Sequence, residues 1–138
     1  PIIQSNCYII PCLKARAIDE NNKVILVKQH RFPHGYVIEI PAGTLEKREE
    51  PKKCAFREFE EETGYVAKKM TPLITYYPSI GYNTEAIHCF VASGLKKISN
   101  LKLDEDEILS VIKIDLTKII FMIKMVNLMY YLKKKFHI

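Results

Sequence analysis

The sequence lacks the signatures of a zinc site, a thiol-disulfide centre or a membrane span. Its four cysteines include no C-x-x-C pair and no zinc-ligand spacing, so we expect free, buried thiols in a reducing compartment. It contains no run of about 18 apolar residues, no signal peptide and no recognisable targeting motif. These absences predict a cytoplasmic protein that does not enter the membrane.

The composition gives no sign of a second domain. A chain of 138 residues, 48% hydrophobic and 27% charged, is ordinary for one globular domain with a proper core, and it has no internal repeat. We expect a single domain over residues 1–138, and a truncated N-terminus stays open because the chain starts at Pro1 without Met. The net charge of +5 suits either nucleic acid or a pocket for an anionic nucleotide.

The most informative stretch runs from Gly43 to Tyr65 and reads GTLEKREEPKKCAFREFEEETGY. In its second half, Glu58, Glu61 and Glu62 stand at i, i+3 and i+4. On a helix these residues share one face within about 6 Å of each other, and like charges so close are destabilising. A divalent cation removes this conflict, because Mg²⁺ takes hard oxygen ligands. The spacing therefore predicts a helix that carries a metal site.

Local signals support a helix over residues 52–63. Pro51 suits the first turn, where its missing N–H costs no hydrogen bond, and Gly64 suits the left-handed residue that ends a helix. No proline or glycine interrupts the residues between them. Ala55 and Phe59 form an i, i+4 apolar strip, which predicts that this side is anchored and the acidic face points outward.

The same stretch resembles the Nudix box, G-x5-E-x7-R-E-U-x-E-E-x-G-U, where U is a bulky apolar residue. A solvated, Glu-rich amphipathic helix is the alternative, but it explains neither the glycine nor the arginine. The resemblance implies hydrolysis of a nucleoside diphosphate linked to another moiety. It also implies an α/β fold, the Nudix α/β/α sandwich with a mixed β-sheet, in agreement with the order of predicted strands and helices. The match holds at Gly43, Glu49, Arg57, Glu58, Phe59, Glu61, Glu62, Gly64 and Tyr65.

The resemblance implies which residues bind the metal. Glu58 and Glu62 are expected as the primary ligands of Mg²⁺, with Mn²⁺ as an alternative ion. Glu61 is expected as a ligand or a water-mediated partner. In this family the residue before the box glycine offers its carbonyl oxygen to the metal, and that residue is Ala42.

Beyond the box, the chain resembles the ADP-ribose pyrophosphatase branch of the family. By matching position, Arg31 and Glu85 are expected to contact the substrate, and the implied reaction converts ADP-ribose to AMP and ribose 5-phosphate. One departure weakens the assignment of ADP-ribose as the substrate. The branch normally has a proline, a marker of ADP-ribose specificity, at the position of Ile80. The branch resemblance rests on the segments VKQHR, IEIPAG, PSIGYNTEAIHCFVASGL and LDEDEI.

The resemblance also suggests the remaining catalytic groups. Arg57 and Glu49 look like a charge-assisted pair that holds Glu58 in its rotamer. The base in this branch comes from a late acidic loop, which points to Glu105, with Glu107 and then Glu61 next in line. A solvated acidic loop is the alternative for this charge run.

Other functions stay open. The substrate can instead be a dinucleoside polyphosphate or another nucleotide sugar. Some Nudix-fold proteins bind RNA or act as scaffolds without hydrolysis, but these typically lose box glutamates, and this chain keeps them all. Nucleic acid is therefore not the expected partner. The branch forms a homodimer through an N-terminal region of which little is present here, so a homodimer is left open.

The rest of the chain predicts strands, one loop, one long connection and a final helix. The first two strands are expected to form a hairpin. The final helix, residues 117–136, has apolar residues on most sides, which predicts burial against the sheet, with a partner as a further option. The strands are expected at residues 6–13, 24–27, 36–40, 71–77, 85–92 and 110–114, the loop at 29–35 and the polar connection at 94–108.

Overall fold

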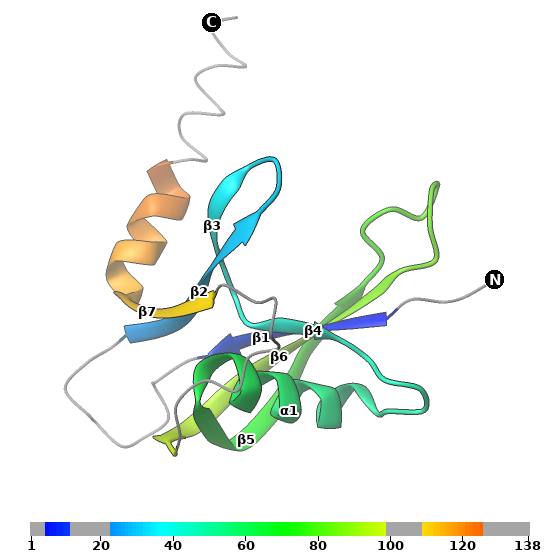
Figure 1. Cartoon of the computed structure of the whole chain (residues 1–138), viewed down its shortest axis with the longest axis horizontal. Helices are drawn as coiled ribbons and strands as arrows, with labels where there is room; N and C mark the ends of the chain where they lie inside the picture. The colour runs from blue at the N-terminus through cyan, green and yellow to red at the C-terminus, as the bar shows by residue number, and fades with distance from the viewer. Residues whose placement is uncertain (1–4, 12–22, 99–108, 126–138) are drawn as a thin grey trace, which may run out of the picture.

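The computed structural model describes residues 5–11, 23–98 and 109–125 (Figure 1). In these parts of the chain, seven strands and a 13-residue helix are assigned, and residues 116–125 form a second helical segment. The bounds are β1 Ser5–Pro11, β2 Lys23–Arg31, β3 Gly35–Glu39, β4 Ala42–Thr44, α1 Pro51–Thr63, β5 Tyr65–Tyr76, β6 Ala86–Lys97 and β7 Leu109–Asp115.

The strands form two sheets. The larger has the order β4-β1-β6-β5 and is mixed, because β1 runs parallel to β6 while the β1–β4 and β5–β6 pairs are antiparallel. The smaller has the order β3-β2-β7 and is antiparallel throughout. The predicted mixed sheet with helices is confirmed. The second, smaller sheet was not predicted from the sequence.

The predicted hairpin between the first two strands is wrong. β1 pairs with β6 from Ser5 opposite Ala86 to Pro11 opposite Ala92, whereas β2 pairs with β3 and β7. Strands adjacent in sequence pair or neighbour each other only about two-thirds of the time, because packing around the core also decides the partner. Here the core separates β1 and β2 into different sheets.

Several strands are longer than expected. β2 continues through Gln29 to Arg31, so the predicted loop over residues 29–35 shrinks to the tip of the β2–β3 hairpin. β5 begins at Tyr65, directly after α1, and β6 continues through Gly94 to Lys97. Most of these added positions are polar or exposed, and a search for apolar runs therefore passes over them.

The helix α1 agrees closely with its prediction. It begins at Pro51 and ends at Thr63. Gly64 takes the left-handed conformation, with φ of 69°, and its N–H donates to the carbonyl oxygen of Glu60 at 2.8 Å. Proline at the start and glycine just past the end thus fix both ends of the helix.

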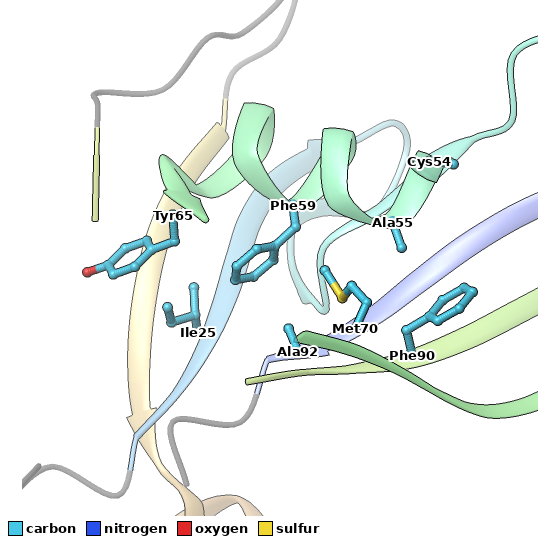
Figure 2. Close-up of a cluster of buried hydrophobic side chains, with 8 residues drawn as sticks. All are labelled: Ile25, Cys54, Ala55, Phe59, Tyr65, Met70, Phe90 and Ala92. Atoms are coloured by element: carbon cyan, nitrogen blue, oxygen red, sulfur yellow. The ribbon is translucent and has the colours of Figure 1, made fainter. Parts of the chain in front are cut away.

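The core lies between α1 and the two sheets (Figure 2). Ala55 and Phe59 are fully buried, which confirms the predicted apolar strip of α1. The helix packs against β5, β1 and β4, and this contact fixes which side of the helix carries the glutamates. The core cluster consists of Ile25, Cys54, Ala55, Phe59, Tyr65, Met70, Phe90 and Ala92.

The predicted burial of the final helix is wrong where the structure describes it. Leu116 and Ile119 are half-buried, but Phe121 is 63% exposed and Ile123 is 56% exposed. The segment follows β7, the edge strand of the smaller sheet (Figure 1). Within the described ranges, no helix is long and apolar enough to cross a membrane.

Candidate active site

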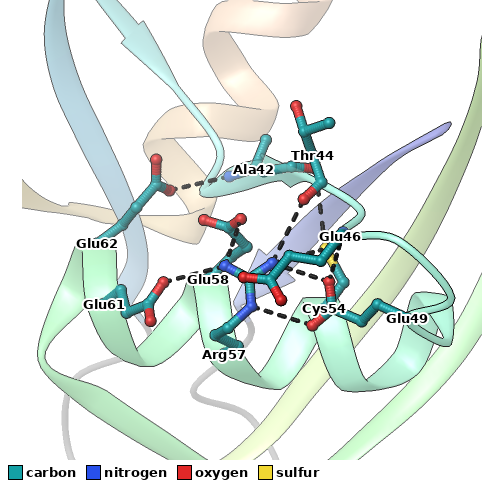
Figure 3. A network of polar contacts seen from close by, with 10 residues as sticks. Ala42, Thr44, Glu46, Glu49, Cys54, Arg57, Glu58, Glu61 and Glu62 are labelled. Carbon is teal, nitrogen blue, oxygen red and sulfur yellow. Dashed lines mark hydrogen bonds and ion pairs between the residues drawn. The ribbon is translucent and has the colours of Figure 1, made fainter. Parts of the chain in front are cut away.

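Arg57 of α1 is the centre of a network of charged groups (Figure 3). Its Nε and Nη2 donate to the two carboxylate oxygens of Glu49, at 3.0 and 2.9 Å. The bond to Glu49 raises the pKa of Arg57, and the same bond holds the pKa of Glu49 below its usual value. Both groups are therefore charged at neutral pH, and the pair expected from the sequence is formed.

The same guanidinium also contacts two of the predicted metal ligands. Nη1 donates to Glu58 at 2.8 Å and to Glu61 at 3.1 Å, while Nη2 donates to the carbonyl oxygen of Thr44 at 3.3 Å. One cation thus lies among three carboxylates and joins α1 to β4. This explains how the helix carries Glu58 and Glu61 side by side, because the guanidinium offsets their repulsion.

Glu62 is held by a separate contact. The residue is only 7% exposed, and its Oε2 accepts the backbone N–H of Ala42 at 2.9 Å. Burying a carboxylate is costly unless hydrogen bonds stabilise it. The bond from Ala42 therefore offsets part of the cost of burying Glu62. It also brings Glu62 to the start of β4, at Ala42, the residue whose carbonyl oxygen is another predicted ligand.

Gly43 leaves the space that Glu58 occupies. A Cβ built on Gly43 falls 1.8 Å from Cδ and 2.0 Å from Oε1 of Glu58. Real Cβ atoms essentially never come this close to another heavy atom, so any side chain here displaces the carboxylate. The first residue of the box is thus explained by the approach of β4 to α1.

The donor set suits a hard divalent cation, but it is not assembled around one point. Carboxylates and a backbone carbonyl are the ligands that Mg²⁺ prefers. Among the described residues, however, no three His, Cys, Asp or Glu side chains form a group that could hold a metal. Glu58 and Glu61 contact Arg57 instead, and Glu62 contacts Ala42. The metal ligands therefore stay a prediction.

The other predicted site residues make contacts of their own or lie outside the described parts. Arg31 ends β2 and donates to Glu39 from Nε and Nη2, at 3.2 and 3.0 Å. Glu85 is half-buried just before β6, and its N–H donates to Asn83 at 3.2 Å. Glu105 and Glu107 lie outside the described residues.

Two features of the backbone at the site were not expected from the sequence. Thr44 takes part through its backbone carbonyl, which no side-chain pattern reveals. The turn before α1 also places Glu49: the N–H of Glu46 donates to Glu49 Oε2 at 3.0 Å, and the N–H of Glu49 donates back to the Glu46 carbonyl at 3.0 Å. This turn holds Arg48 at φ of 68°. Residues other than glycine rarely adopt such a positive φ, so an arginine at this position does not suggest it.

Comparisons with known proteins show the family of the chain. A family model described as "NUDIX domain" matches residues 14–133. The chain is 46% identical over 102 residues to the "ADP-ribose pyrophosphatase" of Bacillus subtilis (strain 168), which covers 72% of this chain and 55% of that protein. It is 46% identical over 110 residues to the "Methanol dehydrogenase activator" of Bacillus methanolicus, covering 78% of this chain and 60% of the relative.

A solved structure supports the fold. The structure titled "Crystal structure of ADP compounds hydrolase" superposes with a TM-score of 0.74 at 20% identity, covering all of this chain and 77% of the other. The chain spans little more than half the length of the two curated relatives that it matches.

Proposed function

Because the chain belongs to the NUDIX domain family, we propose that it is a pyrophosphohydrolase that needs a divalent metal ion. The observation that carries this proposal is the network around Arg57, in which box residues from α1, β4 and the turn before α1 meet (Figure 3). Within this network, Gly43 leaves the room that the carboxylate of Glu58, a predicted metal ligand, occupies.

Each residue has a role in the proposed reaction, in which water adds across the P–O–P link. Glu58 and Glu62, with Glu61 and the carbonyl of Ala42, would hold the ion. When bound, Mg²⁺ or Mn²⁺ supplies charge neutralisation at the phosphate oxygens and lowers the pKa of the attacking water. Glu105 is proposed to take the proton from that water, on the strength of its matching position alone.

ADP-ribose is the proposed substrate, with AMP and ribose 5-phosphate as products. The 46% identity to a protein named "ADP-ribose pyrophosphatase" supports this choice. Arg31 and Glu85 are proposed to contact the substrate, and for Arg31 this requires release of Glu39. Ile80, in place of the expected proline, favours testing dinucleoside polyphosphates and other nucleotide sugars alongside.

The proposal extends to the setting of the enzyme. We propose a single domain over residues 1–138, a cytoplasmic location and a homodimer. In the described parts of the chain, Cys54 and Cys89 form no disulfide, which suits a reducing compartment. Retention of all the box glutamates disfavours a scaffold that binds RNA without turnover.

The experiment compares the wild-type protein with Glu62→Gln. The amide oxygen that this substitution introduces can still accept the N–H of Ala42, but the amide lacks the charge of a metal ligand. We expect the wild type to hydrolyse ADP-ribose with Mg²⁺ or Mn²⁺, and chelator to abolish the activity. Glu62→Gln should fold normally and lose about 10²-fold or more in kcat. Equal turnover in excess chelator, or RNA binding with no turnover of any nucleotide, would overturn the proposal.

A further inference from the structure

We propose that Arg57 acts as an internal counter-ion that competes with the metal for Glu58 and Glu61. This inference rests on the proposed metal site and concerns its control. The guanidinium contacts both carboxylates through the same nitrogen, at 2.8 and 3.1 Å. In the described structure, the two glutamates are thus arranged toward an arginine, in the region where the sequence predicts a metal ion.

The geometry divides the guanidinium into two functional halves. Nε and Nη2 face Glu49 and the Thr44 carbonyl, and neither of these two groups is a predicted metal ligand. Nη1 faces the predicted ligands. Arg57 can therefore release Glu58 and Glu61 without leaving its position, because the contacts on its other side persist.

Charge makes this exchange a competition. A protonated guanidinium beside Glu58 and Glu61 stabilises them without metal and repels an incoming divalent cation. Glu49 offsets part of that positive charge, since it contacts two nitrogens of the same group. Arg57 should thus weaken metal binding while it stabilises the metal-free protein. Glu49 should strengthen metal binding.

The alternative is that Arg57 only positions the carboxylates. The two roles predict opposite effects of the same substitution. If Arg57 is mainly a counter-ion, Arg57→Gln tightens metal binding, and Arg57→Lys, which keeps the charge, stays close to the wild type. If it is mainly a positioning group, both variants weaken metal binding, because neither restores the two-nitrogen contact with Glu49.

The test measures binding of Mg²⁺ by calorimetry and of Mn²⁺ by electron paramagnetic resonance, without substrate. We expect Arg57→Gln to lower the Kd about tenfold and Glu49→Gln to raise it several-fold. In chelator, Arg57→Gln should melt below the wild type, and Mg²⁺ should raise its Tm by more than it raises that of the wild type. Lys52→Gln, which removes a positive charge from an exposed position of α1, should leave the Kd unchanged.

The outcomes separate this inference from the proposed function. If the wild type binds either ion and Arg57→Gln binds it more weakly, the counter-ion inference is overturned while the metal site stands. If Arg57→Gln does not fold, Glu49→Gln tests the inference instead. Metal binding by Glu49→Gln that is unchanged or tighter than in the wild type overturns the inference. If the wild type binds neither ion, the proposed metal dependence fails and this inference fails with it.

Discussion

Gly43 shows how one residue can be required by its neighbour. Its backbone comes so close to Glu58 that a Cβ would overlap the carboxylate. The side chain of Glu58 can rotate away, so the cost in folding stability should be modest. The cost in function should be large, because the displaced group is a predicted metal ligand.

We therefore predict that Gly43→Ala weakens Mg²⁺ binding about tenfold or more and lowers kcat, while the free energy of unfolding falls by roughly 1 kcal/mol. Calorimetry and urea unfolding measure the two effects separately. The matched control is Gly81→Ala, because a Cβ at Gly81 meets no atom within 4 Å. Normal metal binding by Gly43→Ala would show that Glu58 is not a ligand in the conformation described.

At the scale of elements, the contact between Arg57 and Glu49 joins α1 to the turn before it. Because the folded state lowers the pKa of Glu49 from its ordinary value of 4.5, its contribution to stability is complete above that value. The contribution is lost as the pH falls through the lower pKa of the folded state. Acid should thus weaken the attachment of this turn to the helix.

A comparison of the wild type with Glu49→Gln tests this effect of acid on stability. Near pH 7 the variant should be less stable by roughly 1–3 kcal/mol, the range for losing a partner of a charged hydrogen-bonding group. The difference between the two proteins should close as the pH falls below about 4.5. Urea unfolding at a series of pH values measures it, and a gap that stayed constant in acid would contradict the role given to Glu49.

The elements predicted correctly are those whose signals are local. Pro51, Gly64 and the strip of Ala55 and Phe59 fix α1 within a few residues, and the structure has it there. The pairing of β1 with β6 could not be predicted, because it depends on contacts between residues about 80 positions apart, which no local pattern encodes.

The site shows the same division. The contact of Arg57 with Glu49 was expected because the box fixes both positions. The contact of Arg57 with Glu61 was not, although the two residues are one helical turn apart, because the box assigns that glutamate to the metal. The role of Glu105 stays a prediction, since that residue lies outside the described parts of the chain.

At the scale of the molecule, an arm formed by residues 71–84 projects from the rest of the described chain (Figure 1). It carries no charged residue between Lys69 and Glu85, although 27% of the chain is charged. Several of its apolar side chains are exposed, namely Leu73, Ile74, Tyr76, Tyr77, Ile80 and Tyr82. Interface cores are similarly rich in aromatic residues and poor in charge.

The arm suits a second copy of the same chain. An uncharged surface can meet its own copy across a two-fold axis without like-charge repulsion. β5 is an edge strand, but Pro72 and the irregularity between Pro72 and Ile74 make it a poor template for adding another strand. We therefore expect the two arms to pack through their side chains rather than through backbone pairing.

The prediction is that the protein is a homodimer in solution, with twice the chain mass of 16.0 kDa, and that Ile74→Lys converts it to a monomer. A lysine there buries a charge in the interface and leaves the core untouched, because Ile74 is 56% exposed. Light scattering coupled to size-exclusion chromatography measures the mass. Ile38→Lys, at a side chain exposed to 53% on β3, is the matched control and should stay dimeric. Dissociation by Ile123→Lys alone would move the interface to the segment after β7, and a monomeric wild type would refute the dimer.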